Sequence, residues 1–88
     1  MPYIRQIERD ALDSKIDEIS MVVDHDGQLN YVFTRLCHNW IRKVGKKYTR
    51  INQLIGVLEC AKLEFYRMIA APYENTKIEE NGGVGEDL

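Results

Sequence analysis

Basic and aromatic side chains that could hold an anion recur through the middle of the sequence. Tyr31, Arg35 and His38 follow one another at steps of four and three residues, and Arg42 adds a further step of four. Such spacing puts side chains on one face of a helix, and amide groups at the start of the next helix would add partial positive charge. We therefore predict a site for a phosphate or another anionic group, made of Arg35, His38, Arg42, Lys46, Lys47 and Arg50.

Two interpretations of this basic stretch stay open. It is either such an anion site or a solvated helix face whose cations complement the negative end of the helix dipole. An anionic protein, a nucleotide or a nucleic acid would each supply the required charge. The net charge of −2 and the lack of a recognition-helix motif count against dedicated nucleic-acid binding.

A second group of charged side chains lies nearer the C-terminus. Glu59 and Lys62 are three residues apart, as are Glu64 and Arg67. A lysine beside an apolar arc extends to solvent or needs a carboxylate partner. The group is interpreted either as ion pairs along one helix or as a pocket at a subunit or helix interface. Its members are Glu59, Lys62, Leu63, Glu64, Tyr66 and Arg67.

Paired carboxylates raise one enzyme class as an alternative. Magnesium-dependent all-α nucleotide pyrophosphohydrolases hold the metal with ExxE-type pairs on facing helices. Asp13 and Asp17 are four residues apart, and Glu59 and Glu64 are five apart, so neither pair matches that pattern. The sequence therefore favours a non-enzymatic interaction module and keeps such a hydrolase, acting through Glu59 and Glu64, as the alternative.

No metal site, cofactor or catalytic residue is predicted. The sequence has no CxxC pair and no HExxH motif. Cys37 precedes His38, but adjacent helix positions do not face each other, so Cys37 is interpreted as a packing residue.

Three apolar patterns define the elements that would position these side chains. Each repeats at steps of three and four residues, which predicts helices, and strand-like alternation is missing. The fold class is therefore all-α, a three-helix bundle with helices within residues 8–25, 28–44 and 49–72. The positions that carry the patterns are Leu12, Ile16, Ile19, Val23, Leu29, Phe33, Leu36, Trp40, Ile51, Ile55 and Leu58.

Glycine and proline predict where these helices end. Gly45 follows two basic residues, which is typical of a helix C-terminus. Pro72 is expected to stop or kink the third helix near Ala71. Residues 1–78 are therefore expected to form a single helical domain, and residues 79–88 a flexible acidic tail.

The third predicted helix is apolar over a broad arc. Two shorter helices in an 88-residue chain can hardly cover such an arc completely. We therefore expect a homo-oligomer assembled through this helix, with a dimer favoured because it is the simplest symmetric form.

The whole-chain composition is that of an ordinary globular domain. The chain is 44% hydrophobic and 30% charged, which argues against disorder throughout and against a disulfide scaffold. Its N-terminal residues carry charges where a signal peptide has its apolar stretch, and no apolar run is long enough to span a membrane. We therefore expect a cytoplasmic protein without membrane contact.

Several stretches resemble one family of small proteins of unknown function found in bacteria, archaea and phages. The resemblance covers nearly the whole chain and implies no activity and no site residue. It is carried by MPYI at residues 1–4, LNYV and TRLCH within residues 29–38, IGVLECAKLEFYR at residues 55–67, APYE at residues 71–74, and KI and ENG within residues 77–82.

Overall fold

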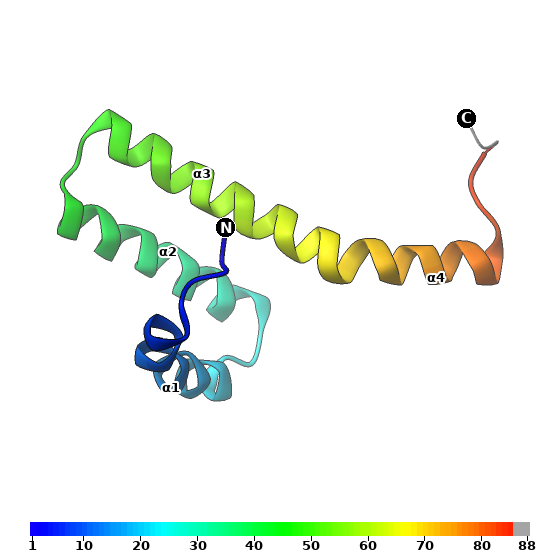
Figure 1. The fold of residues 1–88 in the computed structure, drawn as a ribbon, viewed down its shortest axis with the longest axis horizontal. Helices are drawn as coiled ribbons and strands as arrows, with labels where there is room; N and C mark the ends of the chain where they lie inside the picture. Colours follow the sequence, from blue (N-terminus) through cyan, green and yellow to red (C-terminus); the bar gives the residue numbers. More distant parts are fainter. Residues whose placement is uncertain (86–88) are drawn as a thin grey trace. The chain divides into compact units, whose positions relative to one another are not determined.

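The computed structural model describes residues 1–85, which are 82% helical and contain no strand. Three uninterrupted helical stretches follow one another along the chain (Figure 1), so the predicted all-α, three-helix composition is confirmed. The residues group into two units: residues 2–56 form one, and Met1 with the residues from Val57 onward forms the other. The elements are α1 (Gln6–Val22), α2 (Asp26–Val44), α3 (Tyr48–Phe65), the π-helical turn η1 (Tyr66–Ala70) and α4 (Ala71–Asn81).

A short link with two reciprocal hydrogen bonds joins α1 to α2. The backbone N–H of Asp24 donates to Oε1 of Gln28 at 2.6 Å, and the backbone N–H of Gln28 donates to Nδ1 of His25 at 3.3 Å. Reciprocal bonds of this kind satisfy amide groups that the first turn of a helix leaves without partners. They fix the point at which α2 begins.

Gly45 ends α2 as the sequence predicted. Its φ of 103° lies in the left-handed region, which residues with a Cβ rarely adopt. Its N–H donates to the carbonyl of Ile41 at 2.8 Å, and Arg42 and Lys43 occupy the last turn.

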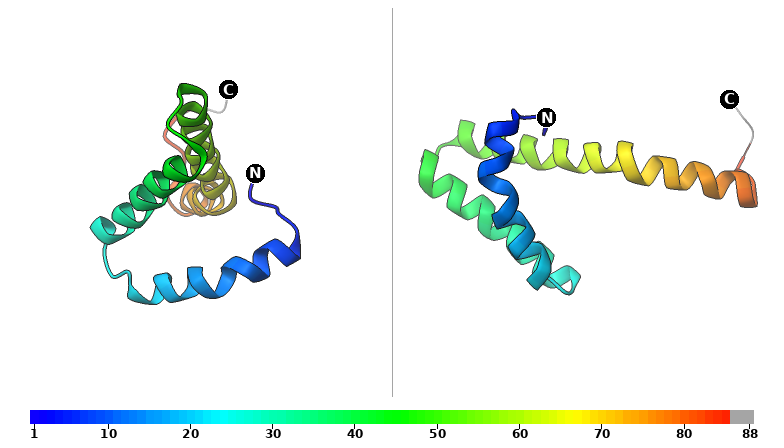
Figure 2. Two further views of the ribbon diagram at one scale, coloured as in Figure 1. Left: turned by 90° about the vertical axis from the view of Figure 1, so that its left-hand side faces the viewer. Right: turned by 60° about the horizontal axis from the view of Figure 1, so that its bottom comes forward.

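Helices α1 and α2 diverge from their link (Figure 2). Side chains of both helices line an open groove between them. No Cα atom of α1 lies within 8 Å of a Cα atom of α2, whereas tightly packed helices have axes 8–10 Å apart. Phe33 is 54% exposed and Trp40 47% exposed. Among residues 1–85, no side chain is buried.

The third helical stretch does not end at Pro72, so of the two expected outcomes, a stop or a kink, the stop was wrong. The helix widens into η1 just before the proline, where the N–H of Ala71 donates to the carbonyl of Tyr66, five residues earlier. The wider turn makes room for a residue that has no N–H and whose ring crowds the preceding turn. The helix then continues through α4.

Gly82, with a φ of 84°, ends α4, and its N–H donates to the carbonyl of Ile78 at 2.7 Å. Residues 79–81, which the sequence analysis assigned to the tail, therefore belong to a helix. Residues 82–85 have no regular structure, and residues 86–88 of the expected tail lie outside the described residues. Within the described part of the chain, no helix combines the length and apolar character needed to cross a membrane.

Candidate functional site

The predicted anion-binding residues occupy the C-terminal half of α2, the link after Gly45 and the first turn of α3. We call this set the basic surface. Residues 27–56 contain six Arg and Lys side chains, of which Lys43 is not part of this set, and not one Asp or Glu. The basic surface comprises Arg35, His38, Arg42, Lys46, Lys47 and Arg50.

Three of these six residues lie around one hollow. His38, Arg42 and Lys46 line a space of about 500 Å³, whose other walls come mainly from Cys37, Ile41, Ile51 and Leu54. The charged side chains of Arg42 and Lys46 thus border apolar walls, an arrangement that suits a ligand or partner with both anionic and apolar parts.

Arg35 is engaged elsewhere on α2. Its Nη1 donates to the hydroxyl of Tyr31 at 3.0 Å, and its guanidinium carbon lies 5.8 Å from the centre of that ring. Lys47 and Arg50 do not line the hollow. The structure therefore brings together His38, Arg42 and Lys46, and leaves the other three residues at the margins of the basic surface.

The basic surface has no internal counter-charge. Within the described chain, none of its six residues forms an ion pair; the four ion pairs given by the structure involve Arg5, Lys62, Arg67 and Lys77 as cations. Its positive charge is therefore available to a group outside the chain.

The ion pairs predicted near the C-terminus are present. Nζ of Lys62 lies 2.9 Å from Oε1 of Glu59, and Nη2 of Arg67 lies 3.0 Å from Oε2 of Glu64. The Lys62 side chain is 68% exposed, and Leu63 is 54% exposed. Both lysine and leucine therefore face outward, and an interface role for this group stays a prediction.

Tyr66 has a partner that the sequence analysis did not foresee. Its hydroxyl donates to Oε2 of Glu74 at 3.0 Å, across the π-helical turn and Pro72. This hydrogen bond, and next the negative charge of Glu74, raise the pKa of Tyr66 above its ordinary value.

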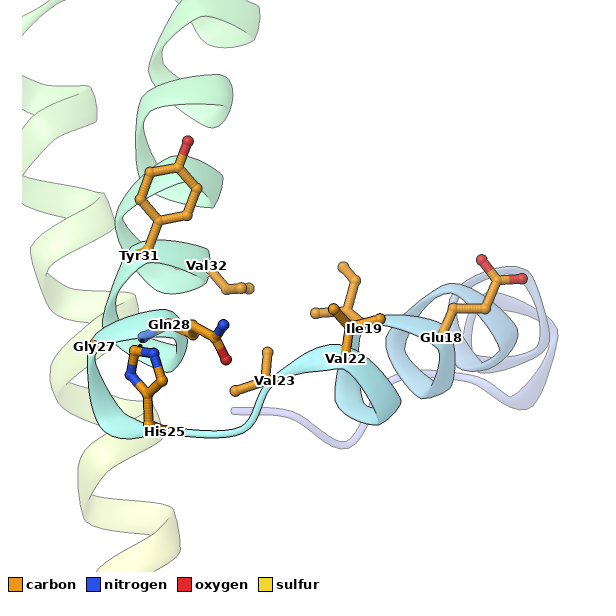
Figure 3. A pocket seen from close by; sticks show the side chains of 9 residues that line it. All are labelled: Glu18, Ile19, Val22, Val23, His25, Gly27, Gln28, Tyr31 and Val32. Atoms are coloured by element: carbon orange, nitrogen blue, oxygen red, sulfur yellow. Dashed lines mark hydrogen bonds between the residues drawn. The ribbon is translucent and has the colours of Figure 1, made fainter.

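The groove between α1 and α2 is the second notable surface, and sequence reasoning missed it. We call it the apolar groove; its volume is about 430 Å³. Figure 3 shows a separate hollow at the link, which shares Ile19, Val23 and Val32 with the groove. There Ile19, Val22 and Val23 face Val32 across the gap, and His25 and Gln28 lie beside the link. The groove is lined by Ile16, Ile19, Ser20, Val23, Leu29, Val32, Phe33 and Leu36.

The acidic character of α1 and its link was also overlooked. Residues 6–26 carry seven Asp and Glu side chains against two basic ones, a net charge of −5. A running charge along the sequence would have revealed this contrast with residues 27–56. The acidic side chains are Glu8, Asp10, Asp13, Asp17, Glu18, Asp24 and Asp26.

Comparison with models of known protein families gives a match over nearly the whole chain. A family model described as "Domain of unknown function (DUF6899)" matches residues 1–84. The chain belongs to the DUF6899 family. This confirms the resemblance to a family without an assigned function. Searches of curated proteins and of solved structures give no match.

Glu59 and Glu64, the residues of the hydrolase alternative, each have a cation three residues further along the helix. In residues 1–85, no three His, Cys, Asp or Glu side chains gather as a metal-binding group. Cys37 is half-buried and Cys60 exposed, both as free thiols.

Proposed function

We propose that this DUF6899 protein is a non-enzymatic module that self-associates and binds an anionic partner through its basic surface. The observation that carries self-association is that no described side chain is buried. A folded domain of this size normally buries about 60% of the surface that its unfolded chain exposes. Full burial of a large apolar side chain contributes roughly 1.5–3 kcal/mol to stability. Much of this stabilisation is therefore obtained only when a second surface covers these side chains.

The third helical stretch supports the same proposal. Phe65 is 64% exposed, Met68 52% and Ile69 56%. One helix cannot bury its own apolar side chains, and helical stability comes mainly from packing against a neighbour. We propose a symmetric dimer in which these side chains contribute to the interface.

The hollow formed by His38, Arg42 and Lys46 supports the second part of the proposal, because these side chains have no counter-charge within residues 1–85. We also propose that the module acts in the cytoplasm, since reduced thiols at Cys37 and Cys60 suit that compartment. Fractionation of the cells that express the protein tests the location.

Self-association is tested by sedimentation equilibrium and native mass spectrometry over a range of protein concentrations. We expect dimers, and a thermal midpoint that rises with protein concentration because association stabilises the folded state. Phe65→Ser should weaken association at least about tenfold, equivalent to about 1.4 kcal/mol. Asn75→Ser, an exposed polar change in α4, is the matched control. A wild-type monomer at every concentration would refute the proposal.

A further inference from the structure

The two charge populations of the N-terminal unit are segregated along the chain. Residues 6–26 have a net charge of −5, and residues 27–56 have a net charge of +6. Both segments belong to the unit of residues 2–56. One unit therefore presents an acidic helix and a basic surface at the same time.

These charges do not neutralise each other inside the unit. No ion pair joins an acidic residue of α1 to the basic surface in the part of the chain that the structure describes. Arg9, one helical turn before Asp13, donates through Nε to the carbonyl of Ile4 at 2.9 Å. The divergence of α1 and α2 explains why the two sets stay apart.

Each charge set also borders apolar surface. Asp13 lines a hollow with Leu12 and Ile16 on α1, and Asp17, one turn further on, shares its face. Arg42 and Lys46 line their hollow with Ile41 and Ile51. Apolar patches edged by charges are the usual composition of a protein–protein interface.

We propose that the anionic partner of the basic surface is α1 of a second copy of this chain. The acidic flank of one α1, with Asp13 and Asp17, lies against Arg42 and Lys46 of the other copy, and the apolar groove is covered in the same contact. In a two-fold dimer this contact forms twice. The inference rests on the proposed self-association and names its charged contact, in addition to the α3 interface.

A second copy fits this surface better than a nucleic acid does. A polyanion drawn to the basic surface would meet the acidic residues of the same unit, and long-range attraction would be weak at a net charge of −2. A second copy supplies both the negative charge and an apolar surface to cover the groove. Complementary potentials also select the correct partner and fix its register.

Paired charge reversals provide the test. The acidic variant carries Asp13→Lys and Asp17→Lys, and the basic variant carries Arg42→Glu and Lys46→Glu. The control, Glu79→Lys with Glu80→Lys, changes the net charge by the same amount as the acidic variant but lies on α4. Association is measured by sedimentation equilibrium and native mass spectrometry at low salt and near 1 M salt, where the Debye length is about 3 Å.

We expect each interface variant alone to associate at least about a hundredfold more weakly than wild type, because like charges then face each other across the contact. The control should stay within about threefold of wild type. Mixing the two interface variants in equal amounts should restore a dimer of mixed composition, since opposite charges meet again at both contacts. High salt should weaken wild-type association. Circular dichroism follows helicity, so recovery on mixing is readable even where one variant unfolds.

The outcomes separate this inference from the proposed function. A monomeric wild type at low salt overturns both. A wild-type dimer that tolerates the reversals, or variants that do not recover on mixing, overturns only the charged contact. Loss of binding to a mixed-sequence RNA or DNA probe in the basic variant, with self-association unchanged, would likewise overturn it and assign the basic surface to nucleic acid.

Discussion

The hydrogen bond from Tyr66 to Glu74 connects residues eight positions apart, which no regular α-helix places side by side. The π-helical turn between them supplies the change in register. The neutral hydroxyl donates to the carboxylate, so this bond and the charge of Glu74 raise the pKa of Tyr66. Because the pKa is higher in the folded state, the stabilisation is present at neutral pH and is lost as pH rises through the folded pKa, above about 10.

The pH dependence of this bond can be measured directly. Wild-type helicity should fall in a step above about pH 10 that Tyr66→Phe lacks, because that variant cannot ionise at the site. Glu74→Gln should move the pKa of Tyr66 back toward its ordinary value. Tyrosinate absorbance and circular dichroism report the two effects, and identical titrations in wild type and Glu74→Gln would show that the bond is absent in solution.

Substitution by alanine should change the stability in opposite directions at two glycines. Gly45 has a φ of 103°, so Gly45→Ala should destabilise the protein by about 1 kcal/mol or more. Gly56 lies inside α3, and a Cβ added there would meet no other part of the chain within 4 Å beyond its own helix backbone. Gly56→Ala should therefore stabilise the protein by about 0.5–1 kcal/mol. Thermal denaturation compares the two. A loss of stability in Gly56→Ala would place this glycine where a second copy approaches the backbone closely.

At the scale of elements, the long C-terminal helix depends on how it accommodates one proline. Pro72 stands at the start of α4, directly after the widened turn. A proline in the middle of a regular helix costs about 3 kcal/mol, and the π-helical turn lets the helix continue past it.

Pro72→Ala removes the reason for that turn. We expect a reversion to regular α-helix, a rise in helicity, and loss of the Tyr66–Glu74 bond, because the residues beyond Ala71 would rotate by about 100° relative to those before Tyr66. Circular dichroism and the tyrosinate titration test this together. A raised pKa of Tyr66 that persists in Pro72→Ala would mean that the turn does not depend on the proline.

The elements show how far the sequence alone could reach. Apolar spacing predicted all three helices, and the basic turn before Gly45 predicted the end of α2, because these signals act within a few residues. At Pro72 a stop or a kink was expected, and the bound at residue 72 followed the stop. The local proline rule gives no sign of the wider turn that carries the helix onward. In the basic surface, His38 and Arg42, which the spacing grouped, line one hollow. Arg35 instead donates to Tyr31, its neighbour one helical turn away.

At the scale of the whole molecule, no described side chain is buried, although the chain is 44% hydrophobic. Such a composition is ample for a core in a chain that packs on itself. We therefore expect contact with a second protein surface to determine the free energy of unfolding. The melting temperature should then depend on protein concentration as well as on sequence.

The separation of acidic α1 from the basic residues 27–56 also bears on how many copies assemble. An acidic face and a basic face on one molecule form a closed dimer only where a two-fold axis relates the two copies. Joined head to tail without such closure, the same two faces would grow an open filament. Ionic strength controls either product, since salt screens the attraction that starts both. Dilution into low salt would then distinguish a clear solution of closed pairs from a turbid suspension of fibres.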